Sequence, residues 1–215
     1  MSKKLLVIIA LLALLPFSAL AATPKEYAES IAANVIDIIE SGKSESTVEQ
    51  ELVQLFKKNV DSDWMAGFTM GKYYRQLSPE QKKKYNELYR DYVIYSYIPK
   101  FRLYTSERMN VIQAIQDDKD FYTVKTSLNT KKSSTGKVFV DYKLKKSGSS
   151  FKIIDVVGEG VSLINTQRSD FSTPLSEGGV ESFLTRLEAK VVALKANPPT
   201  EAKKGDEKKF SAGKK

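Results

Sequence analysis

The stretch FKIIDVVGEGVSLINTQRSDF, residues 151–171, decides the fold, because an apolar strand runs there into a carboxylate flanked by glycines and then into a polar helix start. Residues 151–157 leave no purely polar face, so we expect this strand to be covered on both sides, as a central strand is. Gly158 and Gly160 predict a bulge or a bend beside Glu159. The Glu159 carboxylate is either catalytic or an acceptor of backbone N–H bonds at the bend, and we favour the structural interpretation.

The N-terminus is typical of an export signal. Lys3 and Lys4 precede an apolar run over residues 5–15, and Ala19 and Ala21 have the spacing of a cleavage site. We therefore expect a signal peptide over residues 1–21 and a soluble, exported protein after cleavage. The apolar run is shorter than the roughly 20 residues that cross a bilayer.

Composition narrows the classes of function. The chain has no cysteine, so an exported form has no disulfide framework and depends on packing for its stability. The formal charge is +8, of which two lysines near the N-terminus and a net +3 beyond residue 195 account for five. The remaining +3 on residues 22–195 is too little to indicate nucleic-acid binding.

The first half of the chain has the periodicity of amphipathic helices. Capping boxes begin at Thr23, Ser46 and Ser78, and the third predicts a helix that Pro99 disturbs. A cluster of Met and aromatic residues over 64–70 predicts a short helix that ends near Gly71 and belongs to the core.

From Arg108 the period changes to two, with alternation over residues 123–128 and 138–145 and turn signals between them. This pattern predicts an antiparallel meander with one apolar face. A final amphipathic helix follows over residues 180–194, and residues 196–215 form a Lys- and Pro-rich tail that we expect to be disordered. Helices followed by a meander indicate an α+β fold, with the helices packed on one face of the sheet, in one domain over residues 22–195.

The inventory of catalytic side chains is small. Without His or Cys, the usual general base and the thiol nucleophile are absent, and a metal site would need oxygen ligands alone. Asp155 and Glu159 leave a carboxylate hydrolase open, although no residue supplies a positioned partner. Residues 117–120 lack the spacing of an EF-hand, so they are interpreted as a solvated turn.

Residues 155–165, DVVGEGVSLIN, with Arg168-Ser169, Phe171 and the pair Gly178-Gly179, resemble the signature of the MlaC family of periplasmic phospholipid-shuttle proteins, also called the toluene-tolerance auxiliary family. The segment over residues 73–81 and the spacing of Tyr97, Phe101 and Tyr104 are similar to the helical half of that family. Gly158 departs from the pattern, since a bulkier residue is usual there.

The resemblance implies a non-enzymatic periplasmic carrier that holds phospholipid acyl chains in an apolar pocket between sheet and helices. It also implies two partners, an outer-membrane lipoprotein complex and an inner-membrane ABC transporter with a membrane-anchored lipid-binding subunit. No cofactor and no nucleic acid are expected, and we expect a monomer. An exported binding module for another apolar ligand or a protein partner is the alternative.

Alternation assigns five residues of the meander to one apolar face, and a register that starts at Phe151 adds Ile153 and Val157. Asp155 falls in the same set, which weakens that register and leaves Ile154 and Val156 as substitutes. Tyr97, Phe101 and Tyr104 share one helix side and are expected to close the pocket. The predicted lipid-binding residues are Tyr97, Phe101, Tyr104, Val124, Val138, Val140, Tyr142, Leu144, Ile153, Val157, Val161 and Leu163.

Overall fold

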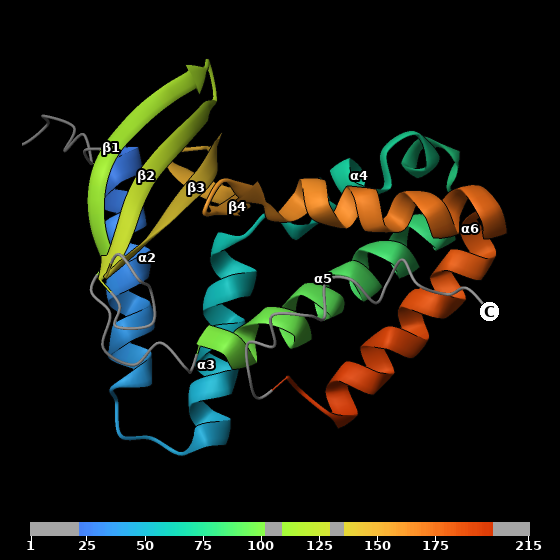
Figure 1. Ribbon diagram of the computed structural model, residues 1–215, viewed down its shortest axis with the longest axis horizontal. Coiled ribbons are helices and arrows are strands. Elements are labelled where there is room, and N and C mark those ends of the chain that lie inside the picture. The colour runs from blue at the N-terminus through green and yellow to red at the C-terminus, as the bar shows by residue number, and fades with distance from the viewer. Residues whose placement is uncertain (1–21, 102–108, 130–135, 200–215) are drawn as a thin grey trace, which may run out of the picture.

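The computed structural model describes residues 22–101, 109–129 and 136–199, without the side chains of residues 100 and 101. An antiparallel sheet lies at one end of the molecule, and most of the helices lie at the other (Figure 1). The α+β class is as the sequence predicts. The elements in order are α2 (Pro24–Ile39), α3 (Glu45–Asn59), α4 (Ser62–Met70), η1 (Gly71–Gln76), α5 (Pro79–Phe101), β1 (Met109–Asp118), β2 (Phe121–Asn129), β3 (Lys137–Ser147), β4 (Ser150–Gly158), β5 (Val161–Ser162) and α6 (Leu163–Ala196).

The helix starts follow the capping chemistry of the sequence. Thr23 and Glu26 form the expected box of α2, in which each side chain accepts a hydrogen bond from the other residue's backbone N–H. Ser78 and Gln81 do the same at the start of α5.

One predicted helix start was wrong, and the effect of Pro99 is small. The second helix begins at Glu45, before the box expected at Ser46, because the Ser44 side chain already caps the Thr47 N–H at 3.3 Å. The third capped helix, α5, continues through Pro99 to Phe101. Pro99 removes one backbone N–H donor, and the chain stays helical on both sides of it as far as it is described.

The sheet is a meander in which each strand pairs with the next one in the chain, in the order β1-β2-β3-β4-β5. The expectation that residues 151–157 form a central strand was wrong in one respect: β4 pairs along its length with β3 but meets only the two-residue β5 on its other edge. The expected burial of β4 on both faces is confirmed, since Phe151 on one face and Asp155 on the other are buried, as is Ile154. Burial on both faces follows from α2, α4 and α6, which all contact this strand.

The last helix, α6, contains a sharp bend at Gly179, where φ is 70° and ψ is −180°. This combination is open almost only to glycine. The bend turns the second half of α6 back so that it runs beside α5, as Figure 1 shows. The apolar residues expected on the final helix, Phe183, Leu187 and Val191 among them, are buried along this second half.

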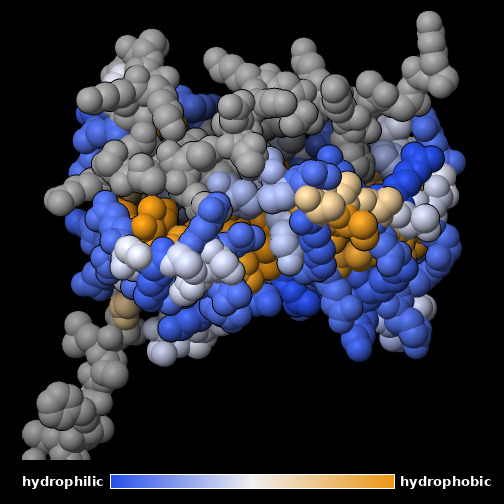
Figure 2. Space-filling model, turned by 90° about the horizontal axis from the view of Figure 1, so that it is seen from below, coloured by the Kyte–Doolittle hydropathy of each residue, from blue (hydrophilic) through white to orange (hydrophobic). Residues whose placement is uncertain are grey.

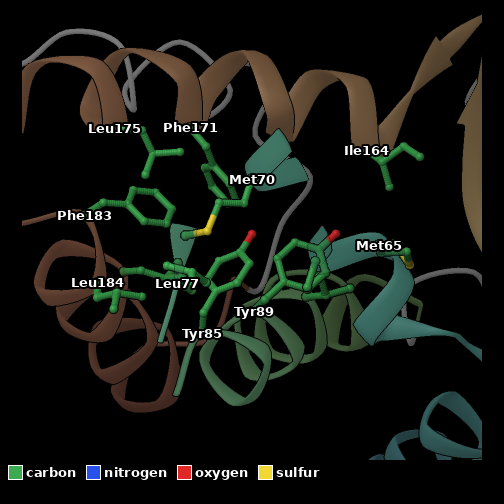
Figure 3. Close-up of a cluster of buried hydrophobic side chains, with 13 residues drawn as sticks. Met65, Met70, Leu77, Tyr85, Tyr89, Ile164, Phe171, Leu175, Phe183 and Leu184 are labelled. Carbon is green, nitrogen blue, oxygen red and sulfur yellow. The ribbon is translucent and has the colours of Figure 1, made fainter. Parts of the chain in front are cut away.

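The helices enclose a core of their own, here called the helical core. Figure 3 shows Tyr85 and Tyr89 of α5 among side chains from α4 and both halves of α6. Met65 and Met70 are buried there, which confirms the interpretation of the Met and aromatic cluster as core. The helical core consists of Met65, Ala66, Met70, Leu77, Tyr85, Tyr89, Val93, Ile164, Phe171, Leu175, Phe183, Leu184 and Leu187.

A second cluster lies between α2 and the sheet, and a third joins α3 and α5, with side chains of α2 packed against it. On the face seen from below, hydrophobic residues reach the surface only as separate patches among hydrophilic ones (Figure 2). The buried apolar side chains thus form three interior clusters, and the sheet cluster holds the buried residues among those predicted to bind lipid, Val124, Leu144 and Ile153.

Candidate functional site

One face of the sheet, called the inner face, carries most of the predicted lipid-binding residues. Directly opposite residues in paired strands share a face. The register places Val124 opposite Tyr142 and Tyr142 opposite Val156, and it places Leu144 opposite Ile153. The same ladder adds further apolar residues to this face. They are Val138 and Val140 of β3, Leu128 of β2 and Met109 and Val111 of β1.

Helix α2 covers one part of the inner face, called the packed half. Tyr27 of α2 stands 5.7 Å from Phe151 between ring centroids, and Phe151 meets Tyr122 edge-on at 5.3 Å. The Tyr27 hydroxyl donates to Asn59 at the end of α3, at 3.2 Å to the side-chain oxygen. Val124 and Leu144 are fully buried in this half. These contacts make the packed half an ordinary close-packed core.

The remaining part of the inner face, called the open half, is only partly covered. Val138, Val140, Tyr142 and Val156 are half-buried. Burial raises the pKa of the Tyr142 hydroxyl to about 12, so this group is withdrawn from bulk water. Tyr142 thus combines a partly exposed ring with a desolvated hydroxyl on an apolar part of the sheet. The open half is therefore the candidate site.

The register corrects one predicted residue. Val157 pairs with Asp141 and lies on the opposite face from Tyr142, so its assignment to the inner face was wrong. A β-bulge between Lys143 and Leu144 of β3 accommodates the extra residue Ile154 in β4. The extra residue shifts the alternation, so Ile153 and Val156 share the inner face and Asp155 points away from it.

Three other predicted residues lie elsewhere. Tyr97 and Leu163 are half-buried against the helical core rather than over the open half. Val161 pairs with Gly158 at the end of the inner face and is 57% exposed. The side chain of Phe101, at the end of α5, and the whole of Tyr104 are outside the part of the chain that the structure describes.

Two surface grooves among the described residues are lined mostly by polar and charged residues. One is lined by charged residues that include Lys57, Asp63, Arg90 and Lys152, and the other runs between α2 and α3. Neither contains a predicted lipid-binding residue. The described residues also include no cluster of carboxylates that could hold a metal ion. Within residues 22–101, 109–129 and 136–199, no helix combines the length and apolarity needed to span a membrane.

Residues 29–189, most of the chain, match the sequence profile of the family described as MlaC protein. The chain belongs to the MlaC family. The intermembrane phospholipid transport system binding protein MlaC of Haemophilus influenzae is 19% identical over 132 residues, which are 60% of this chain and 61% of that protein. The chain thus matches less than two thirds of the length of this curated relative.

A solved structure has the same fold as this MlaC-family chain. It is that of the phospholipid-binding protein from Ralstonia solanacearum in complex with a phospholipid. The TM-score is 0.72 at 20% sequence identity, and the likeness covers 81% of this chain and 99% of the other.

The MlaC-like motif of this chain is a structural joint between sheet and helix. The Asp155 carboxylate accepts hydrogen bonds from the Ser162 hydroxyl at 2.6 Å and from the backbone N–H of Ile164 at 3.1 Å. Glu159 accepts the backbone N–H of Phe139 at 2.6 Å, which confirms the structural interpretation of this carboxylate. Both carboxylates thus bind groups of the fold itself. A hydrolase built on Asp155 and Glu159 finds no support in this arrangement.

The departure of this MlaC-family chain at Gly158 has no packing cost. A Cβ placed on Gly158 would meet no atom within 4 Å. The bend lies one residue later, where Glu159 and Gly160 have φ values of 49° and 81°. Open space at position 158 is compatible with the bulkier residue that is usual in the family.

Sequence reasoning missed that α2 covers part of the inner face. Tyr27 and Ile31 were recognised as one face of a helix, but their target was not, although both pack on the sheet cluster. It also missed Val111 and Met109 of β1, because two β-bulges interrupt the alternation of that strand. The only available signal for α2 was its apolar helical spacing, which is the same whether a helix packs on a sheet or on another helix.

Proposed function

We propose that this MlaC-family protein is a periplasmic phospholipid carrier that shuttles lipid between the outer and inner membranes, as part of an ABC-type transport system. Family membership carries the proposal, and the apolar open half of the sheet supports it. The acyl chains bind against Val138, Val140 and Tyr142, and the charged headgroup stays toward water.

The physical need for a carrier is large. Each methylene group exposed to water costs roughly 0.8 kcal/mol, so a two-chain lipid that crosses water alone faces a cost on the order of 20 kcal/mol. An apolar sheet face removes much of that cost, because it replaces water along the chains. Binding and release need no covalent chemistry, so the protein acts as a carrier rather than an enzyme.

The same proposal names the partners and the compartment. Residues 1–21 act as a cleaved signal peptide, and the domain over residues 22–195 works in the periplasm as a monomer. An outer-membrane lipoprotein complex and an inner-membrane ABC transporter with a membrane-anchored lipid-binding subunit exchange lipid with it. The net charge of +3 on residues 22–195 is compatible with such transient contacts.

Lipid content tests the proposal directly. The protein is purified from the periplasm without detergent, and its extracts are analysed by mass spectrometry. Near-stoichiometric diacyl phospholipid is expected, together with uptake of fluorescent phospholipid from vesicles by the stripped protein. A protein that is lipid-free and takes up none would contradict the proposal, and a different apolar ligand would favour the general binding module.

A further inference from the structure

Tyr142 places a hydroxyl in a mostly apolar part of the inner face. Val124 and Val156 lie directly opposite it on the neighbouring strands. Val140 and Leu144 are its neighbours on the same face of β3. The hydroxyl of Thr126, which lies on the same face opposite Val140, is already engaged, since it donates to the Val140 carbonyl at 2.6 Å.

The Tyr142 hydroxyl has no hydrogen bond to any described residue, whereas three of the other desolvated tyrosines have one. Tyr27 donates to Asn59, Tyr85 is bonded to Thr69 at 2.9 Å, and Tyr89 donates to Gln167 at 2.6 Å. A desolvated hydroxyl without a partner costs free energy, so buried tyrosines normally have one. Tyr142 is only half-buried, so its partner can come from whatever occupies the open half.

The surroundings of Tyr142 select the chemistry of that partner. Burial raises the pKa of Tyr142 to about 12, so the hydroxyl is a neutral donor at physiological pH. Its charged neighbours in β3, Asp141 and Lys143, lie on the opposite face of the sheet. A phosphate without a nearby cation would be costly to place there. The hydrocarbon tails have no acceptor. A neutral carbonyl oxygen fits both conditions.

We propose that the Tyr142 hydroxyl donates a hydrogen bond to an ester carbonyl of a bound diacyl lipid and so fixes how deep the acyl chains lie on the sheet. This inference rests on the proposed function. It makes Tyr142 a determinant of specificity for ester-linked lipids, whereas the valines around it recognise only hydrocarbon.

The test compares two lipids that differ only in the carbonyl. Delipidated protein is titrated with a diacyl phosphatidylethanolamine and with the dialkyl ether analogue of the same chain length. The wild type is expected to bind the ester about threefold to tenfold more tightly, as one neutral hydrogen bond provides. Tyr142→Phe should bind both lipids equally, at the affinity of the wild type for the ether.

Tyr122→Phe is the matched control, because Tyr122 is on the same face but its ring packs on Phe151 in the packed half. It should keep the ester preference. Infrared spectra of carbonyl-labelled lipid supply a second readout, since the hydrogen-bonded ester band should shift in the wild type and not in Tyr142→Phe.

Equal binding of ester and ether by the wild type would overturn the inference. An ester preference that survives in Tyr142→Phe would overturn it as well. Both results would leave the carrier function intact. Failure of the wild type to bind either lipid would overturn the inference together with the carrier function. The isosteric change to Phe removes one oxygen atom, and thermal unfolding verifies that the variant is folded.

Discussion

The carboxylate of Asp155 in β4 accepts a hydrogen bond from the backbone N–H of Ile164 in the first turn of α6, at 3.1 Å. This bond joins the sheet to the helix that completes the helical core, because Ile164 is itself buried in that core. The same carboxylate accepts the N–H of Val156 at 2.8 Å. One buried side chain therefore satisfies backbone donors on both sides of the joint.

Removal of that side chain should destabilise the whole domain. Asp155→Ala leaves two backbone N–H groups and the Ser162 hydroxyl without their acceptor, so we expect a loss of about 2–4 kcal/mol in the free energy of unfolding. Urea denaturation measures it. Asp37→Ala, at an exposed position of α2, is the control and should change stability by no more than about 0.5 kcal/mol. Similar effects of the two changes would contradict the assigned role of Asp155.

Two valines on the inner face should respond differently to enlargement. Val140→Trp, in the open half, is expected to lower the bound phospholipid while the melting temperature of the delipidated protein changes little, since the ring occupies the volume of an acyl chain. Val124→Trp, at a fully buried position, should instead cost about 1–3 kcal/mol or more through overpacking. Lipid quantification and thermal unfolding of both variants provide the comparison. A Val140→Trp protein with a full lipid load would show that this residue is not part of the site.

The bend of α6 should depend on glycine at a single position. At position 179 the backbone adopts a conformation that costs about 1–3 kcal/mol for a residue other than glycine, so Gly179→Ala should destabilise the protein by that amount. Gly158→Ala is the matched control, because its φ is not positive and no atom lies within 4 Å of the added Cβ. Chemical denaturation should show a loss for the first variant and almost none for the second. A neutral Gly179→Ala would mean that the two halves of α6 do not need this bend.

Stability should fall at alkaline pH. Burial raises the pKa of Tyr27 from the ordinary 10.0 to about 12 in the folded chain. The folded state then holds the phenolic proton more tightly than the unfolded state, so the stabilisation is complete below pH 10 and is lost as the pH rises toward about 12. Tyr27→Phe should reduce this fall by about 1–3 kcal/mol, because one pKa unit corresponds to about 1.4 kcal/mol. Urea denaturation at several pH values tests the difference, and identical pH profiles for variant and wild type would refute it.

The Lys-rich C-terminal segment should be dispensable for lipid loading. Residues 200–215 contain few apolar residues and follow the end of α6 at Ala196. We expect a chain that ends at residue 199 to load phospholipid to the same extent as the full chain. Clustered lysines near an anionic membrane add roughly 1 kcal/mol each, so binding to anionic vesicles should weaken. Loss of loading in the shortened protein would contradict this prediction.

Local chemistry in the sequence determined much of this protein. The capping boxes at Thr23 and Ser78, the period of two after residue 108 and the turn at Glu159 depend on neighbours a few residues away, and each is found as predicted. Alternation likewise identified Val124, Tyr142 and Leu144 as one face, because the side-chain period of a regular strand is fixed.

Only the tertiary structure decided which parts of that face are packed and which are open. The bulge opposite Leu144 moved Val157 to the other face, and no local residue pattern marks an insertion whose partner is a different strand. Packing of α2 on the sheet buried Val124 and left Tyr142 half-exposed, although both belong to the same cross-strand pair. Burial here depends on contacts between α2 and strands that begin 70 or more residues after it ends. Apolar periodicity predicts that a helix has a buried side, but it does not identify the surface that covers this side.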